Sequence, residues 1–186
     1  MLNSKPDAHL PRRVVTGTRN GKSLVISDGP VPNAHFHLAT PGLMSAVVWT
    51  TAPVPRLMSE PLEQASRGVQ ITPQPGGTTL LIVTFPPDAV MATPRFDPVG
   101  ADVEYREHLP GLAELFEQDH PGMHTTESID YDIVLDGEIW LELDDGVQTR
   151  MSTGDVAVQC GTRHAWRNKS DRATTMAFVF VGATRP

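Results

Sequence analysis

Residues 122–146 read GMHTTESIDYDIVLDGEIWLELDDG, and residues 154–168 read GDVAVQCGTRHAWRN. In the first stretch, residues 138–143 alternate so that their aliphatic side chains share one face of an extended chain. The Asp136-Gly137 pair that precedes this run is a strong signal for a hairpin turn. Both stretches therefore predict antiparallel β-structure.

Other short runs rich in β-branched and aromatic residues, bounded by turn residues, predict further strands. These runs lie at 13–17, 22–27, 43–51, 78–85, 130–135, 155–159, 164–168 and 175–181. Sixteen of the seventeen prolines lie at or before Pro121. Because proline lacks the N–H that a central strand must donate, we expect the most regular sheet after that residue. Short strands at this spacing favour an antiparallel sandwich or a small barrel.

Composition narrows the class of protein. The chain has 186 residues, which predicts a single domain over residues 1–186. Its net charge of −7 argues against nucleic acid or an anionic membrane as the main partner. No apolar run approaches the roughly 18 residues that a membrane span needs, and no signal peptide is visible. The single cysteine, Cys160, fits a cytoplasmic protein, and we expect a small molecule as its substrate.

Three parts are expected within the domain: N-terminal strands over 1–91, a helical insertion over 92–121 and a core over 122–182. The insertion holds the one helix that the sequence predicts, at 101–120, with apolar residues at helical spacing: Leu112, Leu115 and Phe116. We expect the insertion to cover the mouth of the barrel as a lid, with this apolar face packed on the barrel. The alternative is a surface decoration that stabilises a dimer.

The two stretches resemble the two conserved motifs of the cupin superfamily, G-x5-HxH-x3,4-E-x6-G and G-x5-P-x-G-x2-H-x3-N. The matching positions are His124, Thr126, Asp130 and Gly137 in the first motif and Gly154, His164 and Asn168 in the second. Thr126 stands where the second histidine is usual, Asp130 replaces the glutamate, and Cys160 replaces the proline. The loop before His164 is also one residue shorter than the motif.

The resemblance implies an all-β fold, the antiparallel double-stranded β-helix or jelly-roll barrel, with N-terminal strands and one short helix inserted before the first motif. It also implies one divalent metal ion, which could be Fe, Mn, Zn or Ni. The ligands that remain are His124, Asp130 and His164, a two-histidine, one-carboxylate set with positions open to water, O₂ or substrate. The alternative is a degenerate cupin in which these side chains only hydrogen-bond within the barrel. Family precedent implies a homodimer formed through the N-terminal hairpin.

Two residues near His164 are candidates for substrate binding. Trp166 shares the parity of His164, so it is either a flat wall of the cavity or part of the core. Arg163 is either a bidentate partner for a substrate carboxylate or a solvated turn residue. Tyr131, which has the opposite parity to Asp130, is expected to pack elsewhere.

The remaining histidines and the cysteine carry weaker expectations. His35 and His37 form a second HxH pair, but no glutamate follows at motif spacing, so we interpret them as loop or edge-strand residues. His120 is expected to be exposed, with an accessory role at the metal as the alternative. Cys160 is expected to be a small buried hydrophobic residue rather than a nucleophile.

Three function classes remain open. The first is a metal-dependent lyase, a dehydratase or decarboxylase, in which the metal polarises an oxygen of a small substrate. In this class Asp130 is the general base, and Thr126 orients the leaving hydroxyl. The second is a non-haem iron dioxygenase with the same ligands, and the third is a non-catalytic small-molecule-binding protein.

Overall fold

The computed structural model describes residues 10–59, 61 and 68–186, so residues 1–9, 60 and 62–67 lie outside the account that follows. The described strands are β1 (Arg12–Arg19), β2 (Lys22–Pro30), β3 (His35–Phe36), β4 (Met44–Thr51), β5 (Thr78–Phe85), β6 (Ser128–Asp136), β7 (Glu138–Glu142), β8 (Gln148–Ser152), β9 (Val156–Cys160), β10 (Ala165–Arg167) and β11 (Thr174–Gly182). The helices are α1 (Pro98–His108) and three short 3-10 turns, η1 (Asp88–Ala92), η2 (Ala113–Leu115) and η3 (Asp144–Gly146).

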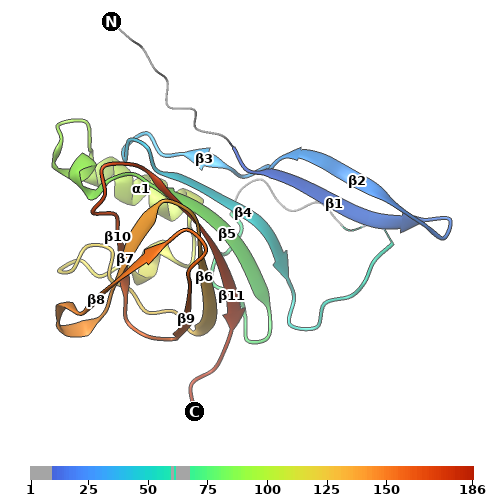
Figure 1. The fold of residues 1–186 in the computed structure, drawn as a ribbon. Coiled ribbons are helices and arrows are strands. Elements are labelled where there is room, and N and C mark those ends of the chain that lie inside the picture. The colour runs from blue at the N-terminus through green and yellow to red at the C-terminus, as the bar shows by residue number, and fades with distance from the viewer. Residues whose placement is uncertain (1–9, 60, 62–67) are drawn as a thin grey trace, which may run out of the picture.

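The strands form antiparallel sheets, as expected for a double-stranded β-helix. A six-stranded sheet has the order β3-β4-β5-β11-β6-β9, and a three-stranded sheet has the order β10-β7-β8. These two sheets face each other across one core, while the β1-β2 hairpin projects away from the barrel (Figure 1). Fully buried side chains from both sheets fill the core, among them Leu81, Val134, Ile139 and Met176.

Each strand that the sequence predicts is present with similar bounds, and one strand, β8, was missed. Strand β8 reads QTRMS, and its first three residues are exposed, so it carries no apolar alternation that could reveal it. Strand β3 contains only two residues, His35 and Phe36, at the edge of the larger sheet.

The expected turn at Asp136-Gly137 joins β6 to β7. Gly137 has a φ of +95°, and a Cβ atom placed on it would lie 2.5 Å from the Thr174 Oγ1 atom. Glycine is therefore required here both by the backbone conformation and by the close approach of β11.

The predicted helix at 101–120 is wrong in its bounds. Helix α1 begins at Pro98, where the Oδ1 atom of Asp97 accepts hydrogen bonds from the N–H groups of Val99 and Gly100. It ends at His108, because the next residues include Pro110 and then Gly111, which has a φ of +83°.

Because the helix stops there, the expected apolar face at Leu112, Leu115 and Phe116 does not exist as one surface. Leu112 is buried in the core and Phe116 packs against the core, whereas Leu115 is exposed. The segment nevertheless packs inward through Leu109 and Ala113, which also belong to the core. No helix among the described residues is both long and apolar enough to cross a membrane.

Candidate functional site

Two histidines meet inside the barrel. His124 and His164 exchange backbone hydrogen bonds, with N–H to O distances of 3.0 and 2.9 Å, and their ring centroids lie 4.4 Å apart. Both side chains are buried. The bridge joins the segment before β6 to the segment before β10, and therefore connects the two motif stretches.

Hydrogen bonds to the backbone determine which ring nitrogens are free. The His124 Nδ1 atom lies 3.0 Å from the carbonyl oxygen of Gly122, and the His164 Nδ1 atom lies 2.9 Å from that of Thr162. A carbonyl oxygen only accepts, so each Nδ1 atom carries the hydrogen and donates it. Both Nε2 atoms are then lone-pair donors, which is the arrangement usual for histidines that bind a metal.

Burial keeps this pair neutral. It lowers the pKa of His124 to about 4, assisted by the neighbouring His164. Burial also lowers the pKa of His164. Since only neutral imidazole binds a metal, both side chains are in the form that can hold a divalent ion.

A row of buried polar residues continues from this pair along β6. Alternate residues from His124 to Asp132 are buried, as period-two alternation requires. The hydroxyl of Thr126 donates to Asp130 Oδ2 at 3.1 Å. The other oxygen of Asp130 and both oxygens of Asp132 are buried and have no hydrogen-bond partner.

Burial raises the pKa of both carboxyl groups in this row. Burial, together with the charge of Asp130, raises the pKa of Asp132 to about 8. Burial also raises the pKa of Asp130, while the nearby side-chain hydroxyl groups of Ser128 and Thr126 oppose that change. Asp132 is therefore protonated at neutral pH and can act as an acid beside a second carboxyl group. Sequence reasoning did not select Asp132, although its shared parity with Asp130 was visible.

The structure brings two of the three predicted ligands, His124 and His164, into contact, and it joins the third, Asp130, to Thr126. Among the described residues, the one group of at least three His, Cys, Asp or Glu side chains that could share an ion is His35, His37 and Glu104, whose ligand atoms lie within 4.8 Å of one another. Convergence of Asp130 on the His124–His164 pair stays a prediction.

The placement of His35 on an edge strand is confirmed, but its chemical partner was missed. His35 and His37 lie next to Glu104, which belongs to α1 and comes 69 residues after His35. No motif has such a spacing, so only the packing of α1 against β3 reveals this cluster. The described structure therefore contains a group of residues that could hold a metal outside the two motifs.

The candidate substrate residues lie close to the histidine pair. The Trp166 ring lies 6.0 Å from that of His164 and also packs against the core, at 5.8 Å from Phe178. The Arg163 guanidinium donates to Glu117 at 2.7 and 2.6 Å and to Asp144 at 2.7 Å. Arg163 would thus bind a substrate carboxylate only by exchanging one of these partners for it.

The remaining expectations have mixed outcomes. His120 is exposed, as expected, and lies 3.4 Å from Glu117. Tyr131 points outward from β6 and is 44% exposed. Cys160 is exposed, so the prediction of a buried residue is wrong. On β9 the inward position belongs to the neighbouring Gln159, which pairs with Asp130 in register.

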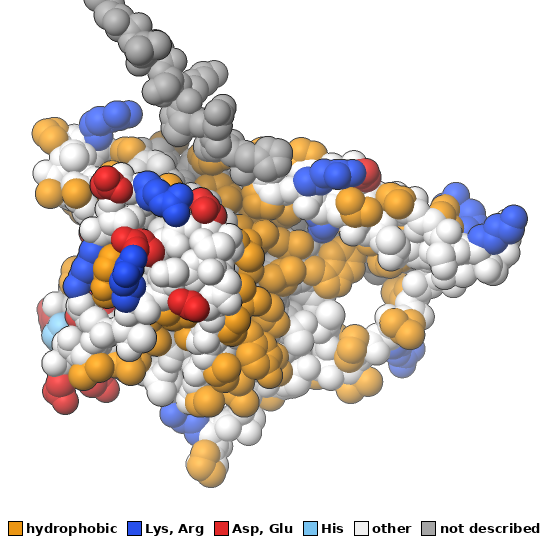
Figure 2. All heavy atoms as spheres, in the orientation of Figure 1, with side chains coloured by type: hydrophobic (Ala, Val, Ile, Leu, Met, Phe, Trp, Pro, Cys, Tyr) orange, Lys and Arg blue, Asp and Glu red, His pale blue; other side chains and the backbone are white. Residues whose placement is uncertain are grey.

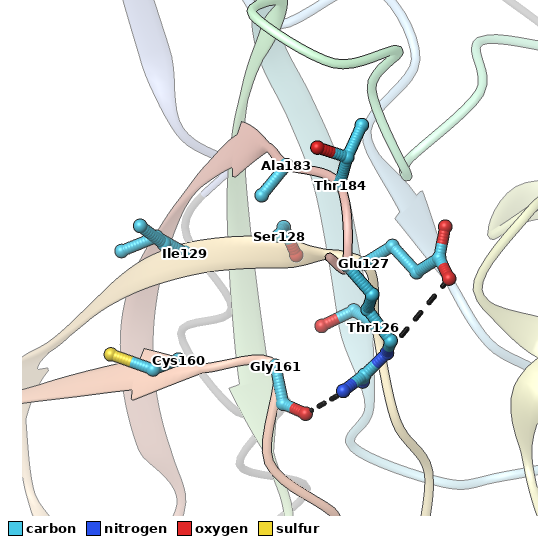
Figure 3. A pocket seen from close by; sticks show the side chains of 9 residues that line it. Thr126, Glu127, Ser128, Ile129, Cys160, Gly161, Ala183 and Thr184 are labelled. Atoms are coloured by element: carbon cyan, nitrogen blue, oxygen red, sulfur yellow. Dashed lines mark hydrogen bonds and ion pairs between the residues drawn. The ribbon is translucent and has the colours of Figure 1, made fainter.

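A pocket of about 220 Å³ lies next to the start of β6 (Figure 3). Its lining includes Ile129, Gly161 and Arg185, and the Arg185 guanidinium donates to the Gly161 carbonyl oxygen at 2.9 Å. Thr126 also lines this pocket and is hydrogen-bonded to Asp130, so it is common to the pocket and to the interior polar row.

In comparison with known proteins, the chain has relatives that match only part of its length. No family model matches the chain. It is 45% identical over 105 residues to phomopsin biosynthesis cluster protein D of Diaporthe leptostromiformis, which covers 55% of this chain and 51% of that protein. It is 42% identical over 93 residues to oryzines biosynthesis cluster protein J of Aspergillus oryzae, which covers 50% and 48%. The chain thus spans about half the length of these curated relatives.

Other similar proteins carry the word cupin in their descriptions. The cupin-domain-containing oxidoreductase virC of Hypocrea virens is 44% identical over 52 residues, which covers 28% of this chain and 27% of that protein. A cupin 2 conserved barrel protein of Salinispora arenicola is 18% identical, with a TM-score of 0.36 and coverage of 57% and 64%. The cupin domain of Schizosaccharomyces pombe Cnp3 is 11% identical, with a TM-score of 0.44 and coverage of 94% and 89%.

Three observations show which proteins this chain is similar to. The two larger antiparallel sheets form the double-stranded barrel, and the two motif stretches meet inside it at His124 and His164. A stretch of 52 residues is also 44% identical to a protein described as cupin-domain-containing. In its fold and in its two motif stretches, the chain is similar to proteins of the cupin superfamily.

Proposed function

We propose that this protein is an enzyme that removes water or carbon dioxide from a small oxygenated organic molecule by metal-assisted acid–base chemistry. The observation that carries the proposal is the pair of buried carboxyl groups on β6, of which Asp132 has a pKa of about 8. Two carboxyl groups in different protonation states can supply a base and an acid at once. Similarity to proteins of the phomopsin and oryzines biosynthesis clusters supports a substrate from small-molecule biosynthesis.

A divalent ion (Fe, Mn, Zn or Ni) bound by His124 and His164, with Asp130 as a third ligand, would act as a Lewis acid toward a substrate carbonyl or carboxylate. The backbone carbonyl oxygens that accept from the two Nδ1 atoms hold both rings in the tautomer that leaves Nε2 free. The Thr126 hydroxyl holds one oxygen of Asp130, so that the other oxygen keeps a defined direction.

In a dehydration, Asp130 would take a proton from the carbon next to the substrate carbonyl group. Asp132 would give its proton to the hydroxyl group that leaves, so that a carbon–carbon double bond and one water molecule form. Thr126 can orient that hydroxyl group, and Trp166 would offer a flat wall beside His164. Phe116, whose ring lies 5.2 Å from that of His124, covers another side of the pair and would help to exclude water.

A non-haem iron dioxygenase is the second candidate. Three relatives, virC, fogC and srdD, are described as cupin-domain-containing oxidoreductases. Two histidines with free Nε2 atoms and open ligand positions suit O₂ chemistry as well as Lewis-acid chemistry. A binding protein without catalytic activity is the third candidate.

The test compares the apoprotein reconstituted with Zn²⁺ and with Fe²⁺ on a panel of β-hydroxy carbonyl and β-keto acid compounds. Turnover with Zn²⁺ in the absence of O₂, lowered by Asp132→Asn, would support the lyase. Turnover that requires Fe²⁺ and consumes O₂ would identify the dioxygenase instead. Saturable binding of a compound without turnover under either condition would leave a binding protein.

The proposal includes a homodimer in the cytoplasm, with neither nucleic acid nor a membrane as partner. The outward faces of β6 and β9 present exposed apolar side chains: Ile129, Tyr131, Val156 and Val158. Figure 2 shows hydrophobic side chains gathered between the barrel and the β1-β2 hairpin, which itself exposes Val14 and Val25. A second copy with a matching apolar face would cover the outward faces of β6 and β9 and the exposed apolar side chains of the hairpin. The single cysteine supports the reducing compartment.

A further inference from the structure

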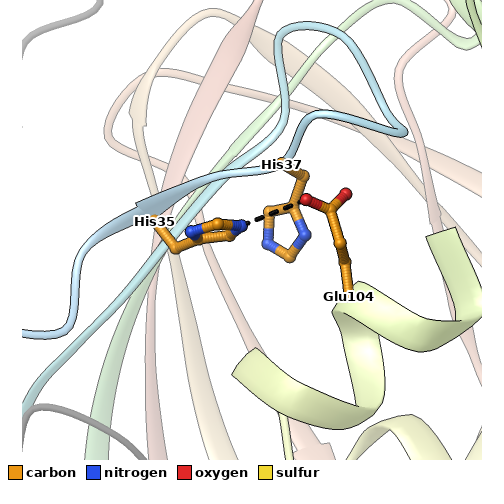
Figure 4. Close-up of side chains that lie close together, drawn as sticks. All are labelled: His35, His37 and Glu104. Carbon is orange, nitrogen blue, oxygen red and sulfur yellow. Dashed lines mark hydrogen bonds and ion pairs between the residues drawn. The ribbon is translucent and has the colours of Figure 1, made fainter. Parts of the chain in front are cut away.

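A second cluster of ligating side chains lies outside the two motifs, between the N-terminal strands and α1. His35 belongs to β3, His37 follows it directly, and Glu104 projects from α1 toward both rings (Figure 4). The ring of His108, also in α1, stacks on that of His35 with a centroid separation of 3.5 Å and an interplanar angle of 5°. Three imidazoles and one carboxylate thus gather where α1 meets the sheet.

The spacing of the ligand atoms suits a small divalent ion. The His35 Nε2 atom lies 3.3 Å from the Glu104 Oε1 atom. Two ligands about 2.0–2.1 Å from a tetrahedral zinc ion are separated by about 3.3 Å, so this edge already has the required length. The ligand atoms of all three residues, His37 included, lie within 4.8 Å of one another.

The carboxylate is held in place by the backbone. Glu104 Oε1 accepts a hydrogen bond from the Leu38 N–H group at 2.9 Å, and Glu104 Oε2 accepts one from the Ala39 N–H group at 2.8 Å. Partial burial alone would raise the pKa of Glu104, but these two hydrogen bonds and the one from His35 outweigh that effect and lower it. Glu104 is therefore an anion in a fixed orientation, without needing a metal to order it.

One ring nitrogen of His37 is buried in a way that a purely structural role for the hydrogen bonds of this cluster does not explain. Its side chain is only 3% exposed, and its Nε2 atom lies 3.0 Å from the Ser45 hydroxyl oxygen. Its Nδ1 atom is buried without any hydrogen-bond partner. Leaving a buried polar atom unpaired costs about 1–3 kcal/mol, so such an atom calls for a ligand. Burial and the nearby His35 lower the pKa of His37 to about 4, so the ring is neutral at neutral pH, and its Nδ1 atom offers a lone pair when Nε2 donates to the Ser45 hydroxyl.

We propose that His35, His37 and Glu104 form a second metal site that binds a divalent ion of the zinc class. Two neutral imidazoles and one carboxylate are the donor set that zinc and cobalt(II) accept, with a fourth position left to water. The single negative charge of the ligands favours a dication. The site does not depend on the proposed lyase activity.

The place of the site in the fold indicates what a bound ion would do. It would join β3 to α1, and α1 carries Tyr105, whose ring lies 5.4 Å from that of His37. The Tyr105 ring lies 6.2 Å from that of Phe116, which in turn lies 5.2 Å from that of His124. An ion at this site would therefore fix the segment that covers the histidine pair in the barrel.

The experiment separates the two sites by substitution. Co²⁺ is titrated into the full-length His124→Ala/His164→Ala variant, and visible absorption and metal content after dialysis are recorded. We expect one bound Co²⁺ per chain, with the intense absorption bands of a four-coordinate ion. Adding His37→Ala or Glu104→Gln to this variant should weaken binding at least tenfold, whereas His120→Ala, at an exposed histidine, should not change it.

Two further measurements distinguish loss of metal binding from loss of folding. If His37→Ala lowers the Tm of the metal-free protein so far that it unfolds, His35→Asn and Glu104→Gln provide the same comparison at partly exposed positions. Limited proteolysis between residues 86 and 121 should become slower when Co²⁺ is added, and only while the cluster is intact. Equal Co²⁺ uptake with and without His37 and Glu104, or no uptake by the double variant, would overturn the proposal.

Discussion

His124 and His164, forty residues apart in the chain, exchange two backbone hydrogen bonds and bring their rings within 4.4 Å. Each ring is also tied through Nδ1 to the carbonyl oxygen two residues before it. The same backbone bridge that joins the two sheets thereby sets the orientation of both candidate ligands. The backbone hydrogen bonds that hold the barrel together therefore also orient the two candidate ligand rings.

The first prediction concerns this pair. His164→Ala should weaken metal binding at the barrel site by more than about 10–100-fold, the loss that removal of a merely supporting partner causes. Isothermal titration with Zn²⁺ measures this change in affinity. The protein used carries Glu104→Gln, which disables the proposed site at His35, His37 and Glu104. His120→Ala is the matched control, because His120 is exposed. An unchanged affinity in His164→Ala would show that the pair is not a metal site.

The second prediction follows from the raised pKa of Asp132. Between the ordinary value of 3.8 and the folded value of about 8, the folded chain holds a proton that the unfolded chain releases. The stabilising contribution of this protonated group is thus complete below pH 3.8 and is lost as the pH rises toward 8.

Asp132→Asn removes that dependence. We expect its Tm to exceed that of the wild type at pH 8, by about 2–4 °C for each kcal/mol gained, with the difference vanishing near pH 4. Thermal unfolding followed by circular dichroism over this pH range measures both curves. A constant difference at all pH values would contradict a raised pKa in the folded state. The same variant should lose turnover, because the amide cannot donate the proton of a carboxylic acid.

Acid should destabilise the metal-free protein through its buried histidines. The pKa values of His124 and His37 fall from 6.5 to about 4 on folding, because burial disfavours their charged forms. Their contribution to stability is present above pH 6.5 and is lost as the pH falls toward 4. His124→Gln should flatten this part of the Tm profile in the presence of EDTA. Retention of the full acid-induced loss in that variant would assign the effect to other groups.

Two glycine substitutions, one in the turn between β6 and β7 and one between β8 and β9, test whether close packing requires a glycine in the first turn. Gly137→Ala should destabilise the fold by about 2–4 kcal/mol, because a Cβ atom there would meet Thr174 at 2.5 Å and the backbone is left-handed. Gly154→Ala should cost only about 1–2 kcal/mol, since Gly154 also has a positive φ but no heavy atom lies within 4 Å of a Cβ atom. Urea unfolding of both variants measures the difference, and equal losses would refute the steric argument.

The fifth prediction concerns self-association. Val158→Glu, on the outward face of β9, should convert the expected dimer into a monomer, because a charge would be buried at the interface. Val147→Glu, at an equally exposed residue between η3 and β8, is the control and should leave the dimer intact. Sedimentation velocity measures the mass in each case. Dissociation by both variants, or by neither, would exclude this face as the interface.

The strands could largely be predicted from local patterns. Alternation in residues 138–143 and the Asp136-Gly137 turn depend only on neighbours in the chain, and the structure contains both features. The bounds of α1 could not be predicted from apolar spacing, because the Pro110-Gly111 pair ends the helix before Leu112. Strand β8 was missed because its exposed side chains need not be apolar.

The sequence by itself determined the barrel, its two motif segments and the histidines that face each other across them. The strands follow from alternation and turn residues, which are local properties of the chain, whereas the barrel type and the meeting of the two histidines were implied by the resemblance of the motif segments to cupins. Only the tertiary structure decided that Asp132 is protonated, since its pKa depends on burial and on the charge of Asp130. Only the tertiary structure, likewise, placed Glu104 beside His35 and His37, because the packing of a helix on a distant strand has no spacing rule in the sequence.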